Sequence, residues 1–332
     1  MRYRIFLVGL GLFFWTIGLH FANSNIWRNE EAHDINRALE WIQTTKLSDH
    51  GANLFVGSSN TACSFDPRQL DSLSIADRWY NLGQPGMTDF ELVDFALHLV
   101  QDVDPDEVNA LFIEVIAQDV TKWTPDWRNV QIMDCSSAIE LLGAKLKLES
   151  EGAHQWDSVR LFIQFILMKW SAPIHNWLHA APADWNESRR GYRTQGELRR
   201  TDVKSEVAKQ ILHMRQAQLD GYRAYLESGE IEAQAERVRL AFPMKRLALL
   251  LEKATSKGIK VHLFSLLTEK TEHLHAAITQ NLRCSVFMPS CNRDISILVD
   301  PRFLRDPLHL NKEGAHEMGR LLLNEYPTKL PH

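Results

Sequence analysis

Cysteine is scarce in this sequence, and its four cysteines do not form a CxxC pair. A zinc site built from paired cysteines is therefore not expected. The histidines at positions 175 and 179, and those at 273 and 275, lack the glutamate of an HExxH motif, so core or solvated histidines explain them better. We predict neither a metal nor another cofactor. Cys284 and Cys291 are close enough to form a small disulfide loop in an oxidising compartment, and free thiols are the alternative.

Long basic runs are also lacking, and no basic residues alternate with aromatic ones as in a nucleic-acid groove. Nucleic acid is therefore excluded as a partner. The net charge of −5 is spread along the chain and names no partner. No internal repeat or low-complexity linker occurs, and 45% hydrophobic with 24% charged residues is a globular composition. The 332 residues suffice for one large α/β domain with an insertion.

One long apolar run stands near the N-terminus, at residues 5–22. Its eighteen residues are near the lower limit for spanning a bilayer. Arg2 and Arg4 precede the run and acidic residues follow it at 30–34, so we expect the N-terminus in the cytoplasm and the rest exported. The segment 1–25 is thus predicted to be a membrane anchor. A cleavable signal ending near residues 22–24 is the alternative, and in both cases the domain is extracytoplasmic, periplasmic or at the cell surface.

The remaining chain alternates strands with helices, which predicts a three-layer α/β domain over residues 29–332 with a parallel sheet. Short apolar runs indicate strands at residues 52–56, 77–82, 109–116, 258–267 and 295–299. Helical spacing is found at residues 29–46, 89–100, 202–227, 231–256 and 312–325.

Residues 120–245 show little strand periodicity and are predicted to form a helical insertion. Tryptophan is concentrated here, which favours a packed segment over a loose linker. Six of the ten tryptophans lie in this stretch: Trp123, Trp127, Trp156, Trp170, Trp177 and Trp185. The apolar run 159–170 is also compatible with a helix on a membrane surface, but we favour packing on the core.

Two segments carry residues suited to acyl chemistry. Gly57-Ser58-Ser59 follows the first predicted strand, where backbone N–H groups of a helix start can stabilise an oxyanion. Asp306 and His309 stand three residues apart, just before the last helix. A serine nucleophile needs a base, and the base needs an orienting carboxylate, so Ser59, His309 and Asp306 are the candidate catalytic residues. Asn311 is the expected N-cap of the last helix.

In these blocks the chain resembles the SGNH (GDSL-like) hydrolase superfamily. That family begins with Gly-Asp-Ser after strand one and ends with Asp-x-x-His before the last helix. Ser58 stands in place of the aspartate, so the resemblance gives Ser59 the nucleophile position. The segment 81–86, Asn-Leu-Gly-Gln-Pro-Gly, resembles the second block, which implies an oxyanion-hole N–H from Gly86 beside that of Ser59. The resemblance covers about residues 50–120 and 245–325 and implies a flavodoxin-like sheet.

The third block departs from the family pattern. Where the family has Gly-x-Asn-Asp, this chain reads Ile-Ala-Gln-Asp at 116–119, so Gln118 would be the amide donor of the oxyanion hole. Similar departures, combined with a membrane anchor, occur in SGNH-like proteins that O-acylate extracellular polymers, such as those of alginate O-acetylation and of D-alanyl transfer to teichoic acids.

The resemblance implies a serine esterase or O-acyltransferase that acetylates or deacetylates an extracytoplasmic polysaccharide. For acetyl transfer it also implies a multi-span membrane protein that delivers the acyl group. The alternative is a catalytically inactive SGNH-fold protein that binds polysaccharide or assists assembly of a polysaccharide export or modification system. The altered third block and the serine at position 58 motivate this alternative.

Overall fold

The computed structural model describes residues 11, 41–42, 47, 51–74, 78–84, 87–116, 123–148, 153–178, 205–230, 240–266, 271–282, 286–287 and 295–325. The predicted anchor at 1–25 lies outside this part of the chain apart from Gly11, and so does the cysteine pair Cys284 and Cys291. Among the described residues, no helix is both long enough and apolar enough to cross a membrane.

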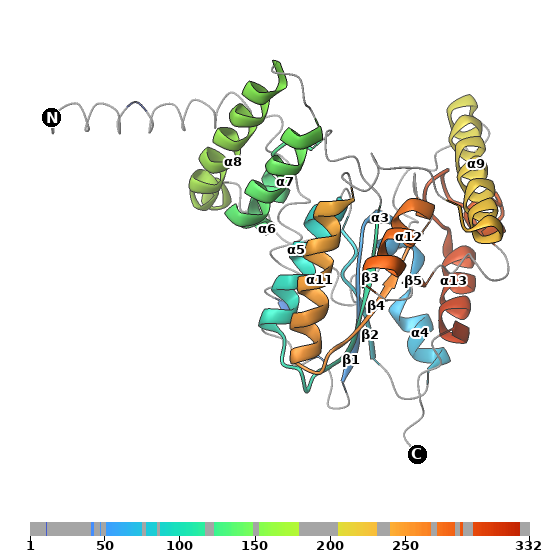
Figure 1. Cartoon of the computed structure of the whole chain (residues 1–332). Helices are drawn as coiled ribbons and strands as arrows, with labels where there is room; N and C mark the ends of the chain where they lie inside the picture. Colours follow the sequence, from blue (N-terminus) through green and yellow to red (C-terminus); the bar gives the residue numbers. More distant parts are fainter. Residues whose placement is uncertain are drawn as a thin grey trace, which may run out of the picture. The chain divides into compact units, whose positions relative to one another are not determined.

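A parallel sheet forms the centre of the larger unit (Figure 1). Its strands are β1 (Ala52–Val56), β2 (Arg78–Asn81), β3 (Val108–Glu114), β4 (Lys260–Phe264) and β5 (Val286–Phe287). The strand order is β2-β1-β3-β4-β5, and every neighbouring pair is parallel. Parallel pairing needs crossovers, which the intervening helices supply. All strand carboxyl ends therefore meet at one edge of the sheet, the edge at which ligands bind in folds of this type.

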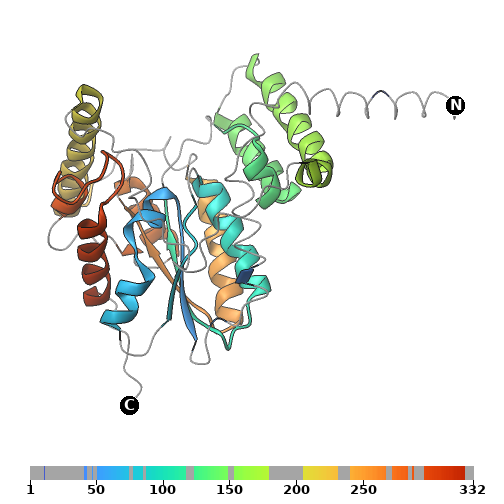
Figure 2. The ribbon, with the colours of Figure 1, turned by 180° about the vertical axis from the view of Figure 1, so that it is seen from behind.

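Helices cover both faces of the sheet (Figures 1 and 2). On one face, α5 (Asp89–Asp102) packs against α11 (Ala241–Ser256), and the guanidinium of Arg246 donates to the buried carboxylate of Asp94 between them. On the other face, α13 (Lys312–Glu325) packs against the short helices α3 (Ser59–Ser64) and α4 (Pro67–Leu73). Two further helices of this unit, α12 (Thr271–Leu282) and α9 (Glu206–Ser228), pack against each other. The predicted α/β class with a parallel sheet between helices is confirmed.

Aromatic rings fill the core between the sheet and its helices. Phe55 of β1 stacks on Phe65 at a centroid distance of 4.3 Å and lies 5.2 Å from both Trp79 of β2 and Phe112 of β3. Phe264 of β4 meets Phe55 edge-on. Large buried rings contribute much of the apolar surface removed from water, so this cluster fixes the sheet below the edge where the strands end.

Helices α6 (Trp127–Ile132), α7 (Cys135–Leu148) and α8 (Ala153–Leu178) form a separate compact unit. Its core includes Leu141 of α7 and Phe165 of α8, and Trp123 packs against Phe165. Lys169 of α8 donates to the carbonyls of Val130 and Met133 at the end of α6, at 2.7 and 2.9 Å. The unit containing the sheet includes α9, whereas the sequence had placed residues 202–227 within the insertion.

Two predictions from the sequence are wrong in detail. Residues 295–299 were expected as a strand, but Ile295–Leu298 forms a 3-10 helix that contacts α13. Ile297 and Leu298 are buried there, and a short apolar run cannot distinguish a buried strand from a buried helical turn. The apolar run 159–170 was expected to pack on the core, but Trp170 is 59% exposed on the outer face of α8, where Trp156 is also 78% exposed. Of the other tryptophans in the predicted insertion, Trp123 is buried, and the side chains of Trp127, Trp177 and Trp185 lie outside what the structure describes.

Candidate active site

The Gly57-Ser58-Ser59 turn joins β1 to α3 at the carboxyl edge of the sheet. Ser58 is the N-cap of α3, and its hydroxyl accepts the N–H of Asn60 at 3.2 Å. Ser59 is therefore the first residue of the helix, where backbone N–H groups have no helical partner and point outward. This position leaves the Ser59 hydroxyl half-exposed beside the donors that an oxyanion requires.

Glu114, the last residue of β3, holds this turn from below. Its Oε2 accepts the backbone N–H of Ser58 and the hydroxyl of Thr61, each at 2.6 Å. The carboxyl group is fully buried, and burial raises its pKa above the usual value of 4.5, although the hydrogen bonds to Thr61 and Ser58 oppose the rise. Both ends of the nucleophile turn are thus tied to one side chain of the neighbouring strand.

Two glycines make room for this arrangement. A Cβ atom on Gly57 would lie 1.9 Å from Thr61 Oγ1 and 2.6 Å from Glu114 Oε2. On Gly83, just after β2, it would lie 2.4 Å from the backbone nitrogen of Ala62 in α3. The side chain of Asn81 braces the same corner, since its amide donates to backbone carbonyls in and just after α3 and its Oδ1 accepts the N–H of Gly83. Any side chain at either glycine would therefore displace the start of α3.

The base comes from the loop before α13. His309 Nε2 lies 3.0 Å from Ser59 Oγ, and His309 Nδ1 lies 2.9 Å from both carboxylate oxygens of Asp306. An Nδ1–H donated to Asp306 fixes the tautomer in which Nε2 is free to accept the serine proton. The structure therefore joins the three predicted catalytic residues in one hydrogen-bonded chain. It reaches from one end of the sheet domain's sequence to the other.

Asp306 is kept in its charged form. Burial alone would raise its pKa, but the hydrogen bonds from the His309 ring and from the backbone N–H groups of Leu308 and His309, together with attraction to the His309 charge, hold the pKa below 3.8. Asn311 then closes the loop, because its Oδ1 accepts the N–H of Gly314 in the first turn of α13 at 2.9 Å. The predicted N-cap is confirmed.

Arg215 of α9 fastens the same loop from outside. It is only 4% exposed, and its guanidinium donates to the carbonyls of Pro307 and Leu308 at 3.0 Å each and to that of Leu266 at 3.4 Å. Burial lowers the pKa of Arg215 to about 10, while attraction to Asp306 and Glu114 opposes the fall. The arginine thus joins α9 to the residues between Asp306 and His309 and to the segment just after β4.

Glu114 and Arg215 were not among the predicted site residues. Glu114 had a visible signal, because it is the one charged residue in the apolar run 109–116. Arg215 had none, since it is one of many charged residues in a long helix. Of the predicted oxyanion donors, Ser59 is described, whereas Gly86 and Gln118 lie outside the described residues. Gln84, two residues before Gly86, is fully buried, and its N–H donates to the carbonyl of Gly57. Its side-chain amide has no hydrogen-bond partner among the described residues.

The arrangement can deprotonate a serine hydroxyl and store the proton on an oriented imidazole, which is the chemistry of acyl transfer. Within the described part of the chain, no three histidine, cysteine or acidic side chains are grouped so that they could hold a metal ion. No protein-family model matches the sequence, and no curated protein is similar enough to count as a match.

Proposed function

We propose that this protein is an SGNH-type serine esterase or O-acyltransferase that acts on an extracytoplasmic polysaccharide. The observation that carries the proposal is the hydrogen-bonded chain from Ser59 through His309 to Asp306 at the carboxyl edge of a parallel sheet. Segments 250 positions apart bring these three side chains together in the order and tautomer that acyl transfer requires. The flavodoxin-like arrangement of the SGNH fold belongs to the same proposal.

The chemistry follows from the positions of these side chains. Ser59 Oγ attacks the acyl carbonyl while His309 Nε2 takes the hydroxyl proton, and the imidazolium is stabilised by Asp306. The N–H of Ser59 would hold the negative charge on the carbonyl oxygen, and the SGNH resemblance implies that the N–H of Gly86 and the amide of Gln118 assist it. The imidazolium returns its proton to the departing oxygen and leaves an acyl-serine. A sugar hydroxyl or water then loses its proton to His309, attacks the acyl-serine and releases Ser59.

A membrane surface is the setting we propose for this chemistry. Residues 5–22 would anchor the chain in a membrane, with the domain on the periplasmic or cell-surface side. A tethered site favours an envelope polymer over a diffusing ester as substrate. As an acetyltransferase it would receive its acyl group from a multi-span membrane protein, as the resemblance to polymer-acylating SGNH proteins implies.

A fluorophosphonate probe tests the serine directly. We expect the full-length protein to be labelled and Ser59→Ala to lose labelling with an unchanged thermal unfolding midpoint. Ser72→Ala, at an exposed serine of α4, is the matched control and should be labelled like the original chain. A folded protein that neither reacts with the probe nor hydrolyses aryl acetates would refute the enzyme and support the inactive binding component. Adding polysaccharide acceptors to the aryl acetate assay separates transferase from hydrolase.

A further inference from the structure

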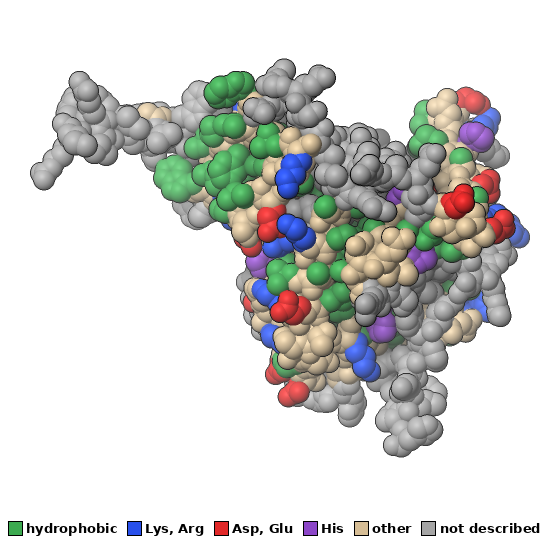
Figure 3. All heavy atoms as spheres, viewed as in Figure 1, with side chains coloured by type: hydrophobic (Ala, Val, Ile, Leu, Met, Phe, Trp, Pro, Cys, Tyr) green, Lys and Arg blue, Asp and Glu red, His purple; other side chains and the backbone are tan. Residues whose placement is uncertain are grey.

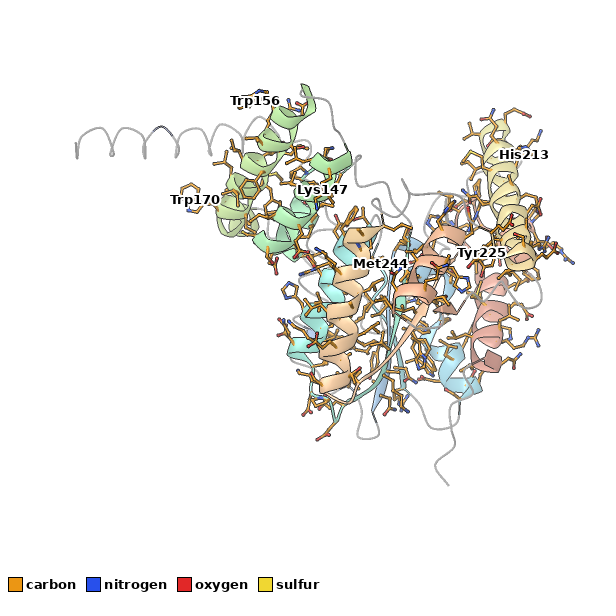
Figure 4. The ribbon with its side chains drawn as sticks, in the orientation of Figure 1. Lys147, Trp156, Trp170, His213, Tyr225 and Met244 are labelled. Atoms are coloured by element: carbon orange, nitrogen blue, oxygen red, sulfur yellow. The ribbon has the colours of Figure 1, made fainter. Side chains whose placement is uncertain are left out.

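Helix α8 carries an exposed apolar stripe, made of Trp156, Val159, Ile163, Ile166 and Trp170. Their spacing of three and four residues places all five on one side of the helix. Figure 3 shows hydrophobic side chains gathered over α7 and α8, and Figure 4 shows Trp156 and Trp170 pointing away from the helix. Exposed apolar residues at this density mark an interaction surface rather than chance exposure.

The stripe is not the side of α8 that packs in its own unit. That opposite side buries Ser158, Leu161, Phe165 and Ser171, and Lys169 reaches from it to the end of α6. The helix is therefore apolar on two sides, and one of them faces the core of its own unit. Packing within the unit explains why that side is apolar but does not explain the exposed stripe. We therefore expect a separate partner to cover the stripe.

The charges around the stripe favour a negatively charged partner. Asp157 is the one acidic residue in α8, and it pairs with Arg160 at 3.5 Å. From residue 158 to the end of α8 no acidic residue occurs, and Arg160 is basic, whereas the ammonium of Lys169 is turned to the end of α6 and does not face the stripe. Lys147, exposed in the last turn of α7, adds a further positive charge to the same unit (Figure 4). Anionic lipid headgroups attract basic side chains of this kind.

Tryptophan at each end of the stripe points to the same surface. Its ring is apolar but its N–H needs a polar partner, which makes tryptophan typical of the boundary between headgroups and acyl chains. The chain also carries its own apolar run at residues 5–22, which would keep α8 close to a bilayer. A second copy fits less well, because the stripe spans two heptads whereas coiled coils need about three or four.

We propose that α8 lies on the surface of an anionic lipid bilayer, with this stripe buried at the level between headgroups and acyl chains. The unit of α6, α7 and α8 is then a second membrane contact in addition to the N-terminal anchor. The proposal concerns where the protein sits and does not depend on the chemistry of Ser59.

Photo-crosslinking from within the stripe tests this contact. Ile163→benzoylphenylalanine is introduced into the full-length chain, which is reconstituted in vesicles of phosphatidylethanolamine and phosphatidylglycerol that contain a radiolabelled phospholipid. The matched control carries the same group at Glu252, an exposed residue of α11. Aryl acetate hydrolysis and thermal unfolding of each variant show that fold and catalytic site are intact.

We expect the variant at position 163 to form on the order of fivefold more lipid adduct than the variant at 252. The excess should fall when phosphatidylcholine replaces phosphatidylglycerol, and when Trp156→Ser and Trp170→Ser are added. Equal lipid adducts at the two positions, crosslinked dimers as the main product, or failure of the chain to bind vesicles would each overturn the proposal. None of these results bears on labelling of Ser59, so the two proposals fail separately.

Discussion

Replacing Arg215 with methionine should loosen the loop that carries Asp306 and His309. The two 3.0 Å hydrogen bonds to Pro307 and Leu308 have a charged donor, and such bonds contribute about 1.5–3 kcal/mol each. Removing the charge also relieves the cost of burying it. The net cost is about 3 kcal/mol, from the fall of the Arg215 pKa to about 10, in which burial outweighs the attraction to Asp306 and Glu114. Because methionine fills similar volume, we expect the free energy of unfolding to drop by about 2 kcal/mol.

The effect on catalysis should exceed the effect on stability. With its carbonyls released, the loop can move His309 Nε2 away from its 3.0 Å contact with Ser59, and a displacement of about 1 Å costs on the order of a hundredfold in rate. The assay is aryl acetate hydrolysis at a temperature where each variant is fully folded, with urea unfolding measured in parallel. We expect kcat to fall and KM to change little.

Arg223→Met is the matched control. Arg223 lies on the same helix, and its side chain is 50% exposed beside Asp220 at 3.6 Å, so its loss should cost no more than about 0.5 kcal/mol and leave kcat unchanged. If Arg215→Met unfolds like Arg223→Met and keeps full kcat, the reasoning about the clamped loop is refuted. Arg215→Lys should recover part of the stability but little of kcat, because an ammonium cannot reproduce the guanidinium fork.

Three further variants probe the site. The raised pKa of Glu114 means that the folded protein binds the proton of this carboxyl group more tightly than the unfolded chain does. The free energy of unfolding should therefore fall as pH rises from 4.5 through the folded pKa. Urea titrations at several pH values should show that Glu114→Gln removes this fall. In thermal unfolding, Gly57→Ala should lower the free energy of unfolding by on the order of 2–4 kcal/mol, because the added Cβ meets Thr61. Gly143→Ala, which has open space in α7, should raise the free energy of unfolding by about 0.5–1 kcal/mol. Equal effects of the two substitutions would contradict the contact with Thr61. The lowered pKa of Asp306 adds to the free energy of unfolding above pH 3.8, and this contribution is lost as pH falls through the folded pKa. Asp306→Asn should abolish this loss of stability at low pH and reduce aryl acetate turnover by about a thousandfold. Unchanged turnover would argue against the role of Asp306.

Much of the sheet could be predicted because its strands are short apolar runs ended by turn residues. The bounds 52–56 and 312–325 agree with β1 and α13, and β2, β3 and β4 differ by one to three residues at each end, whereas β5 was not predicted. Ser59, Asp306 and His309 could also be predicted, since they stand in local motifs, one at the end of β1 and the other just before α13. A local sequence pattern predicts the secondary structure of its own segment and the residues at that segment's ends.

Contacts between distant segments could not be predicted from such local patterns. Whether Arg215 faces solvent or a loop ninety-two positions further along the chain depends on how α9 docks, and helix periodicity does not specify docking. The same limit explains Trp156 and Trp170. Their apolar character predicted burial, but a helix with two apolar sides can bury only one of them in its own small unit.

The distance in sequence between Ser59 and His309, 250 positions, has a consequence for the order of events in synthesis. Synthesis runs from the N-terminal end, so the serine turn and the Glu114 beneath it are made long before the histidine. Until residue 309 has been made and the loop before α13 has docked, the nucleophile has no base. On the proposed chemistry, no acyl group could be transferred before the domain is nearly complete.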